Sequence, residues 1–289
     1  MRAILYNGNM LSYLHGFHAG NAADVLKHSL LMFCLSYLKK KEKPLLCVDT
    51  HAGAGFYDLA ENREWEKGLG LLLQSTTPPP PMIDAYVTFV RDQRRGGYSG
   101  SPLIMAQMLT KGDRLVCFEL HPREAETLKS SLAEIHGKGK PCMEVRREDG
   151  PAGLTSLLPP PSRRGLIHID PSWEEQIEYE SIPRVVQSAL KRFPEGTFIV
   201  WYPLLALSKE KAAGLPPLPE TLFGLSGGNR CRAELCTDTA ANSPRRMYGC
   251  GLVVFNPPWT LRAALEETLP YLAKVLGGTE GSWRLEWEG

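Results

Sequence analysis

Short apolar runs recur along the chain between longer amphipathic stretches, and this alternation predicts strands connected by helices. In most runs the apolar residues occupy consecutive positions, as expected when both faces of a strand are covered. Strands that alternate with helices are typical of a largely parallel, doubly wound α/β sheet. The runs predict seven strands: Leu45–Asp49, Leu115–Glu119, Met143–Arg146, Leu166–Asp170, Phe198–Tyr202, Ala233–Cys236 and Leu252–Asn256.

Helix signals fill the stretches between the runs. Asn21 can cap a helix whose apolar side chains recur every three or four residues as far as Tyr37, and Ser101 followed by Pro102 marks a second start. Residues 50–114, which separate the first two predicted strands, are too long for a normal crossover. Helical patterns at 62–74 and 83–95 predict a small helical insertion there, and others cover 123–136, 182–193 and 261–276.

Composition and charge limit the possible functions. The 289 residues hold 33 Lys and Arg against 32 Asp and Glu, a net charge of +1, so a nucleic acid must be held by local basic patches or a shaped pocket. With 43% hydrophobic and 22% charged residues, the chain is not disordered. No apolar run approaches the ~18 residues of a membrane span and no leader segment opens the chain, so we expect a cytoplasmic protein.

A glycine-rich turn, Thr50–Gly55, follows the first predicted strand directly. Gly53 and Gly55 let the backbone approach a ligand at the carboxyl end of a parallel strand, where such sheets bind nucleosides. A dinucleotide fingerprint would need glycine at position 58, which is Asp58, so a nicotinamide site is disfavoured. Taken alone, this motif fits a tight turn without a ligand equally well.

Acidic residues end the next two predicted strands. Glu119 stands where a nucleoside ribose would present two hydroxyl donors, and Asp149 with Gly150 follows the third strand, where adenine of the same ligand would lie. Either acid alone fits a solvated strand end or a helix cap better. Glycines, an acid and a second acid at three strand ends in series predict a site for S-adenosylmethionine.

The fourth predicted strand ends in Asp170-Pro171-Ser172-Trp173. The Asp170 carboxylate and the Pro171 carbonyl can both accept hydrogen bonds from an exocyclic amino group, while Trp173 offers a face for a base. Accepting both N–H bonds draws the delocalised nitrogen lone pair toward tetrahedral geometry and directs it at a methyl group. Positioning and electrostatics can then supply most of the catalysis, with Asp170 or water taking a proton.

Asn256-Pro257-Pro258-Trp259 is formally a better match to the [DNS]-P-P-[YFW] pattern of amino-methyltransferases. We prefer Asp170 because it follows a strand that is central in a doubly wound sheet. Asn256 ends the seventh strand, which we expect to be antiparallel, so it would lie at the other edge; a structural turn explains it.

A series of motifs runs in order along nearly the whole chain, from Met10 to Trp259: Met10–Tyr13, His15, Phe17–Asn21, Asp24–His28, Asp49–Gly55, Gly100–Pro102, Glu119–Pro122, Ser162–Gly165 and Trp201–Pro203. As a set, these motifs resemble the bacterial 23S ribosomal RNA adenine-N6 methyltransferase family, RlmJ. The resemblance implies a Rossmann-like class I methyltransferase fold, with a seven-stranded, mostly parallel sheet and an inserted helical subdomain at about 57–100. Residues 1–44 would form a tail and helix that cover the cofactor site, and 45–289 the methyltransferase domain.

The resemblance also implies site residues. Asp170 would be catalytic as well as a cofactor contact, and Tyr13 would face the substrate beside Pro171 and Trp173. Taken from the residues alone, His28 is a helix-surface histidine and Ser101 only a helix cap, so these two cofactor positions rest on the resemblance. The expected S-adenosylmethionine contacts are Lys27, His28, His51, Gly53, Ser101, Glu119, Asp149, Gly150 and Asp170.

The expected partner is 23S ribosomal RNA, with Arg245 and Arg246 as the preferred contacting pair because their polar loop precedes the seventh strand. The histidines between His15 and His18 have no cysteine or carboxylate at ligand spacing, so we expect no metal. We also expect a monomer and no membrane partner.

Two alternatives stay open: the same amino-methyl transfer to DNA or a protein amide, and an RNA-binding homologue with a weakened site. The second arises because the family's Asp-Pro-Pro-Tyr is Asp170-Pro171-Ser172-Trp173 here. Ser172 lacks the proline ring, so we expect a less rigid loop.

Overall fold

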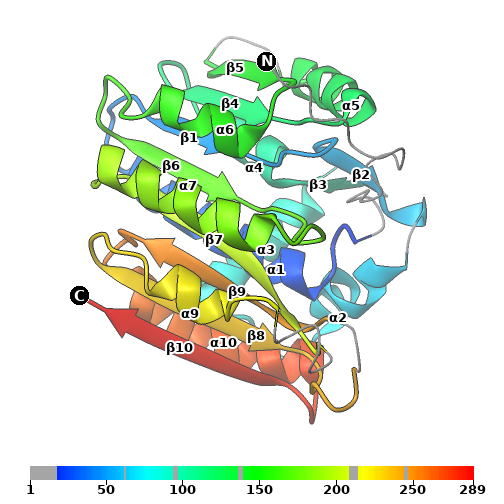
Figure 1. Cartoon of the computed structure of the whole chain (residues 1–289). Helices are drawn as coiled ribbons and strands as arrows, with labels where there is room; N and C mark the ends of the chain where they lie inside the picture. The colour runs from blue at the N-terminus through cyan, green and yellow to red at the C-terminus, as the bar shows by residue number, and fades with distance from the viewer. Residues whose placement is uncertain (1–17, 62, 94–96, 136–138, 208–213, 244–246) are drawn as a thin grey trace.

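Eight strands form one mixed sheet in the computed structural model, which describes residues 18–61, 63–93, 97–135, 139–207, 214–243 and 247–289 (Figure 1). They are β1 (Leu46–Asp49), β4 (Arg114–Phe118), β5 (Cys142–Arg146), β6 (Gly165–Ile169), β7 (Thr197–Leu205), β8 (Arg230–Cys236), β9 (Met247–Phe255) and β10 (Ser282–Glu288). The strand order is β10-β8-β9-β7-β6-β1-β4-β5. Strands β5, β4, β1, β6 and β7 run parallel, whereas the β7–β9, β9–β8 and β8–β10 pairs are antiparallel.

All seven predicted strands are present in this sheet, and the mostly parallel α/β architecture is confirmed. The eighth strand, β10, was not predicted. In β10, Trp283, Leu285 and Trp287 alternate with polar or charged residues, which is the pattern of an edge strand with one covered face. This alternating pattern lacks the consecutive apolar residues that indicate the other strands.

Helices cover both faces of the sheet and enclose two hydrophobic cores (Figure 1). In β1, Cys47 faces one core and Val48 the other, because successive side chains of a strand point to opposite faces. The Cys47 face is covered by α1 (Ala22–Lys39), α4 (Ser101–Met108), α5 (Pro122–Ala133) and α10 (Leu261–Gly277). The Val48 face is covered by α6 (Gly150–Leu154), α7 (Glu178–Arg192) and α9 (Leu218–Phe223).

An inserted segment lies between β1 and α4. It contains two short strands, β2 (Phe56–Asp58) and β3 (Gly97–Ser99), which form a separate antiparallel pair. Both strands were missed because three residues are too few to show a period. The segment also contains the 3₁₀ helices Leu59–Glu61 and Glu64–Lys67, α2 (Leu69–Gln74), and α3 (Pro81–Arg91), which packs against α1.

Helix α1 brings polar residues into the interior. Asn21 caps it as predicted, because its side-chain oxygen accepts the N–H of Asp24 at 3.1 Å. Asp24, Lys27 and His28 are almost completely buried among its apolar residues, and buried polar groups require partners. One of these partners, Asp170, lies at the carboxyl edge of the sheet, where it pairs with Lys27. Across the described ranges, no helix combines the length and apolarity that a bilayer span requires.

Candidate functional site

The carboxyl ends of β1, β4, β5 and β6 lie along one edge of the sheet because these strands are parallel. Asp49 ends β1, and the loops after β4, β5 and β6 carry Glu119, Asp149 and Asp170. His51 interacts electrostatically with three of these acids, Asp49, Asp149 and Asp170, so the loops converge. Among the predicted site residues, those within the described ranges gather at this edge.

Asp170 is held by an ion pair from α1. The Lys27 ammonium donates to Asp170 Oδ2 at 2.6 Å and lies 2.8 Å from Asp24 Oδ1. The three side chains are 12%, 4% and 1% exposed for Asp170, Lys27 and Asp24. Asp24 is anchored in turn, because its Oδ2 accepts the N–H of Gly20 at 2.9 Å. The carboxylate of Asp170 is therefore held by the buried ammonium of Lys27. The same ammonium lies 5.6 Å from the centroid of the Trp201 ring.

The glycine-rich turn and the acid after β4 form one hydrogen-bonded unit. Gly53 has φ +60°, a left-handed conformation that favours glycine, and its N–H donates to Glu119 Oε2 at 2.8 Å. The N–H of His121 donates to Glu119 Oε1 at 2.6 Å. A carboxylate has about four acceptor positions, so Glu119 can still accept two ribose hydroxyls. Burial raises the pKa of Glu119, although these two N–H groups oppose that shift.

A buried acid and a buried histidine, Asp49 and His168, lie next to His51 of the turn. Burial lowers the pKa of His51 to about 4, so this imidazole is neutral at pH 7, and its Nδ1 lies 2.8 Å from Thr50 Oγ1. Asp49 Oδ1 accepts the N–H of His51 at 3.2 Å and lies 3.6 Å from His168 Nδ1. Burial alone would raise the pKa of Asp49, but His168 and the hydroxyl of Ser101 lower it below its ordinary value.

Asp49 and His168 were not among the predicted site residues, although both have a signal in the sequence. They are register partners on β1 and β6, and both side chains are fully buried. A histidine inside an apolar strand, two residues before Asp170, is such a signal. Asp24 was missed as well, because its role depends on a contact made through the fold.

The loops after β1 and β5 meet at Gly150. A side chain there would place its Cβ 2.0 Å from the carbonyl oxygen of Thr50, so only glycine permits this approach. Asp149 caps the short helix α6, since its Oδ1 accepts the N–H of Ala152 at 3.3 Å. Asp149 therefore acts as a helix cap, one of the roles expected for it. Its charge also acts on His51 in the glycine-rich turn.

The Asp170–Trp173 loop has an unusual conformation at its last residue. Trp173 has φ +56° and is 4% exposed. Its indole N–H donates to the carbonyl of Trp201 at 3.1 Å, and its ring meets Tyr179 edge-on at 5.4 Å. This packing differs from the expected open stacking face, because the left-handed backbone turns the indole into the core beside the buried Pro171.

Hydrogen bonds of the Ser172 side chain restrain the loop in place of the proline ring. Its hydroxyl donates to Glu178 Oε2 at 3.3 Å and accepts the N–H of Glu174 at 3.4 Å. Glu178 Oε2 also accepts the N–H of Glu175 at 3.3 Å, which ties the loop to the start of α7. The loop expected to be less rigid is therefore held by side-chain hydrogen bonds.

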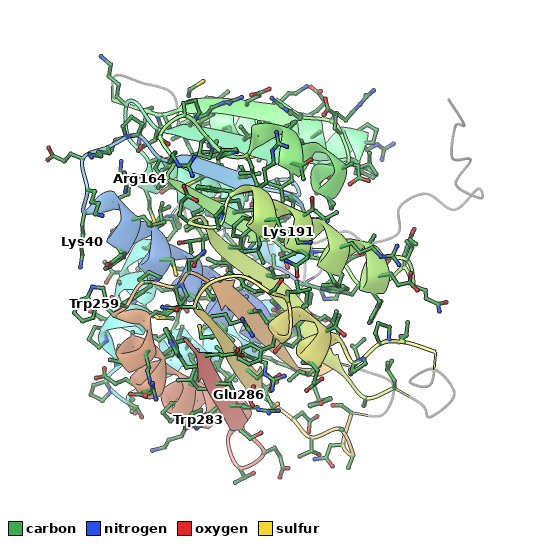
Figure 2. All side chains as sticks on the ribbon, turned by 60° about the vertical axis from the view of Figure 1, so that its left-hand side comes forward. Lys40, Arg164, Lys191, Trp259, Trp283 and Glu286 are labelled. Atoms are coloured by element: carbon green, nitrogen blue, oxygen red, sulfur yellow. The ribbon has the colours of Figure 1, made fainter. Side chains whose placement is uncertain are left out.

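The competing Asn256–Trp259 motif lies at the opposite edge of the sheet. Strand β9 pairs antiparallel with β7, as expected, so Asn256 follows its end at the amino edge of the parallel strands. The Asn256 amide donates to the carbonyls of Pro194 and Gly196 at 2.6 and 2.7 Å, which is a structural role. Trp259 is 78% exposed there, on the side of the molecule that also presents Lys40 and Arg164 (Figure 2).

The remaining predicted residues are distributed as follows. Ser101 is the first residue of α4 and is buried beside Asp49, while His28 is buried on α1 with its Nε2 4.0 Å from Asp24 Oδ1. The proposed RNA-contacting residues Tyr13, Arg245 and Arg246 lie outside the described residues.

Comparisons with known proteins show the family of the chain. The family model described as "Ribosomal RNA large subunit methyltransferase D, RlmJ" matches residues 42–289. Two curated relatives are both named ribosomal RNA large subunit methyltransferase J. The relative from Haemophilus influenzae is 38% identical and the one from Escherichia coli 35%, each aligned over 96% of this chain and 99% of its own length.

A solved structure shares the whole fold. The crystal structure of a Legionella pneumophila protein superposes with a TM-score of 0.82 at 32% identity, covering 93% of this chain and 98% of its own.

Proposed function

The chain belongs to the RlmJ family of ribosomal RNA large subunit methyltransferases. From this premise we propose that it transfers a methyl group from S-adenosylmethionine to the N6 amino group of a specific adenine in 23S ribosomal RNA. The observation that carries the proposal is the placement of Asp170, fixed by Lys27 at the carboxyl edge where the glycine turn and Glu119 also lie.

The charges around Asp170 favour a cationic cofactor. Asp24, Asp49 and Asp170 supply three carboxylates on the face of the sheet covered by α1, and Lys27 pairs with two of them. Carboxylates grouped at one edge of a sheet attract a cationic ligand. S-adenosylmethionine carries a sulfonium and an ammonium against one carboxylate, so its net positive charge suits this group.

The donor and acceptor groups also suit the nucleoside part of that cofactor. Glu119 keeps acceptor positions for the ribose hydroxyls, and Asp149 with Gly150 lies where the adenine would sit. We assign the cofactor contacts to Lys27, His28, His51, Gly53, Ser101, Glu119, Asp149, Gly150 and Asp170.

When bound, S-adenosylmethionine supplies an electrophilic methyl group beside its sulfonium. The chain's own residues orient the acceptor nitrogen. Asp170 and the carbonyl of Pro171 accept the two N–H bonds of the adenine amine, which frees the nitrogen lone pair for attack on the methyl carbon. Lys27 keeps the Asp170 carboxylate in place, and the excess proton leaves to Asp170 or to water. Trp173 supports this loop from the core.

Family membership favours RNA over DNA or a protein amide as the substrate. The interpretation as a weakened homologue rested on Ser172, whose hydrogen bond to Glu178 holds the loop in place of the proline ring. We further propose that Tyr13, Arg245 and Arg246 contact 23S ribosomal RNA and that the enzyme acts in the cytoplasm as a monomer without a metal.

Labelled methyl transfer from S-adenosylmethionine to unmodified, protein-free 23S ribosomal RNA tests the proposal. Asp170→Asn keeps the size of the side chain but removes the charge, and we expect at least a hundredfold loss of kcat, about 2.7 kcal/mol of transition-state stabilisation. Trp259→Ala is the matched control for the competing motif, because this exposed side chain can be removed without opening the core.

The two variants separate the two motifs. We expect full transfer by Trp259→Ala. Full activity in Asp170→Asn together with a large loss in Trp259→Ala would move the site to the other edge of the sheet. Tight RNA binding without any transfer by the wild-type chain would support the non-catalytic alternative.

A further inference from the structure

Three tyrosines of the inserted segment lie buried beside the proposed cofactor site. Tyr57 is on β2, Tyr86 on α3 and Tyr98 on β3, and they are 6%, 0% and 1% exposed. Tyr57 and Tyr98 are direct partners across the two short strands. A phenol hydroxyl removed from water needs a hydrogen-bond partner, so the partners of these hydroxyls show what the segment is built to hold.

Two of the hydroxyls form a chain that ends at α1. The Tyr86 and Tyr98 hydroxyl oxygens are 2.9 Å apart, and the Tyr98 oxygen is 2.6 Å from His28 Nδ1. The rings of His28 and Tyr98 are tilted by 30° with centroids 5.6 Å apart. Because His28 is one turn from Asp24 and adjacent to Lys27, the chain links the interior of the insertion to the residues that hold Asp170.

The donor and the acceptor in each of these two hydrogen bonds follow from the groups at the ends of the network. Burial raises the pKa of both Tyr86 and Tyr98, so each hydroxyl keeps its proton and can donate it once. If Tyr86 donates to Tyr98 and Tyr98 to Nδ1 of His28, Nδ1 is an acceptor and the ring proton is on Nε2. That nitrogen lies 4.0 Å from the Asp24 carboxylate, which attracts an N–H and would repel a lone pair.

Tyr57 supports the glycine turn from the same side. A Cβ on Gly53 would lie 2.2 Å from the Tyr57 hydroxyl oxygen, and one on Gly100 would lie 3.0 Å from its ring. Gly100 immediately precedes Ser101. The insertion therefore touches three separate parts of the proposed cofactor site: His28, the Gly53 turn and the start of α4.

We propose that the inserted segment positions the cofactor site, and that Tyr98 is the positioning residue that holds the imidazole of His28 in its cofactor-binding orientation. This inference rests on the proposed function and assigns the insertion to cofactor binding rather than to RNA recognition. Tyr98 acts through His28 and does not touch the reacting atoms.

Tyr98→Phe is the direct test, because it removes one oxygen and keeps the ring that packs in the core. We expect the Kd and KM for S-adenosylmethionine to rise about tenfold, since His28 Nδ1 loses its buried partner. The KM for RNA and kcat should change less than about twofold, a split that a merely structural role would not give. Tyr86→Phe, one link further away, should raise the cofactor KM about two- to threefold.

Tyr202→Phe is the matched control. The Tyr202 hydroxyl is equally buried and donates to Glu234 at 2.8 Å, but Tyr202 belongs to the core on the other face of the sheet. This variant loses a comparable buried hydrogen bond, so its Tm should fall about as far as that of Tyr98→Phe. Its KM for S-adenosylmethionine should be unchanged.

A double-mutant cycle with His28→Ala shows whether Tyr98 acts through His28. We expect Tyr98→Phe to weaken cofactor binding no further once the imidazole is absent. A second tenfold loss in the His28→Ala background, or an unchanged cofactor Kd in Tyr98→Phe alone, would overturn the inference. Calorimetry separates a failure of this inference from a failure of the proposed function. A wild-type chain that binds no S-adenosylmethionine overturns the proposed function itself.

Discussion

Replacing Lys27 with methionine tests whether buried ion pairs hold the site together. Methionine is close to lysine in length and packs well in apolar surroundings, so the change removes mainly the ammonium. The Lys27 Nζ lies 2.6 Å from Asp170 Oδ2 and 2.8 Å from Asp24 Oδ1, and none of these side chains is more than 12% exposed. The variant therefore leaves two carboxylates in the interior without their shared cation.

The expected destabilisation follows from that geometry. Removing one partner of a buried ion pair costs about 3–5 kcal/mol, because the remaining charge is uncompensated. For a chain of this size, 1 kcal/mol changes Tm by about 2 °C, so we expect a decrease of roughly 6–10 °C. Methyl transfer should fall at least a hundredfold, about 2.7 kcal/mol, because Asp170 loses the group that orients it.

Calorimetric unfolding at pH 7.5 and at pH 5.5 measures the effect, and Lys129→Met is the control. Lys129 pairs with Glu126 at 2.7 Å, but the two side chains are 48% and 70% exposed, so its loss should move Tm by no more than about 1 °C. The deficit of Lys27→Met should shrink at the lower pH, since protonation neutralises the stranded carboxylates, and adding Asp170→Asn should restore part of it. A Tm within about 1 °C of wild type for Lys27→Met would refute this account of the site.

Three further predictions concern the loops around the site. Gly150→Ala would place a Cβ 2.0 Å from the carbonyl of Thr50, so we expect a loss of about 2–4 kcal/mol in urea unfolding and weaker cofactor binding; an unchanged midpoint would contradict the close approach. Burial raises the pKa of Glu119, so acidification should weaken S-adenosylmethionine binding at a higher pH than an ordinary glutamate requires. Glu119→Gln should bind the cofactor about tenfold less tightly, with a flat pH profile in calorimetry. The hydrogen bond that His18 donates to the Glu64 carboxylate raises the pKa of His18 above 6.5. This contact therefore stabilises the fold fully below pH 6.5 and is lost as the pH rises through the higher folded pKa; an NMR titration should show a midpoint that returns toward 6.5 in Glu64→Gln.

Much of the sheet could be predicted because its strands are covered on both faces. Runs such as Leu166–Ile169 are apolar at nearly every position, and that pattern indicates a buried parallel strand. The pattern fails where burial is one-sided, as in β10, and where strands are too short to show any period, as in β2 and β3. Those two short strands pair with each other inside the insertion, and this pairing was visible only in the structure.

The acids of the site could be predicted because parallel strands bring their carboxyl ends to one edge. Glu119 and Asp170 were found in this way. Their partners were not, because Lys27 and Asp170 are 143 positions apart and the pairing depends on how α1 crosses the sheet. The same reason applies to Tyr98, whose contact with His28 spans 70 positions.

The product of the reaction tests the central claim most directly. Protein-free 23S ribosomal RNA would be incubated with the wild-type chain and S-adenosylmethionine, digested to nucleosides and analysed by mass spectrometry against synthetic standards. We expect N6-methyladenosine at close to one residue per RNA molecule, and its formation at least a hundredfold more slowly with Asp170→Asn. A methyl group found instead on a ribose, on a cytosine or on another nitrogen of adenine would contradict the proposed site and its mechanism.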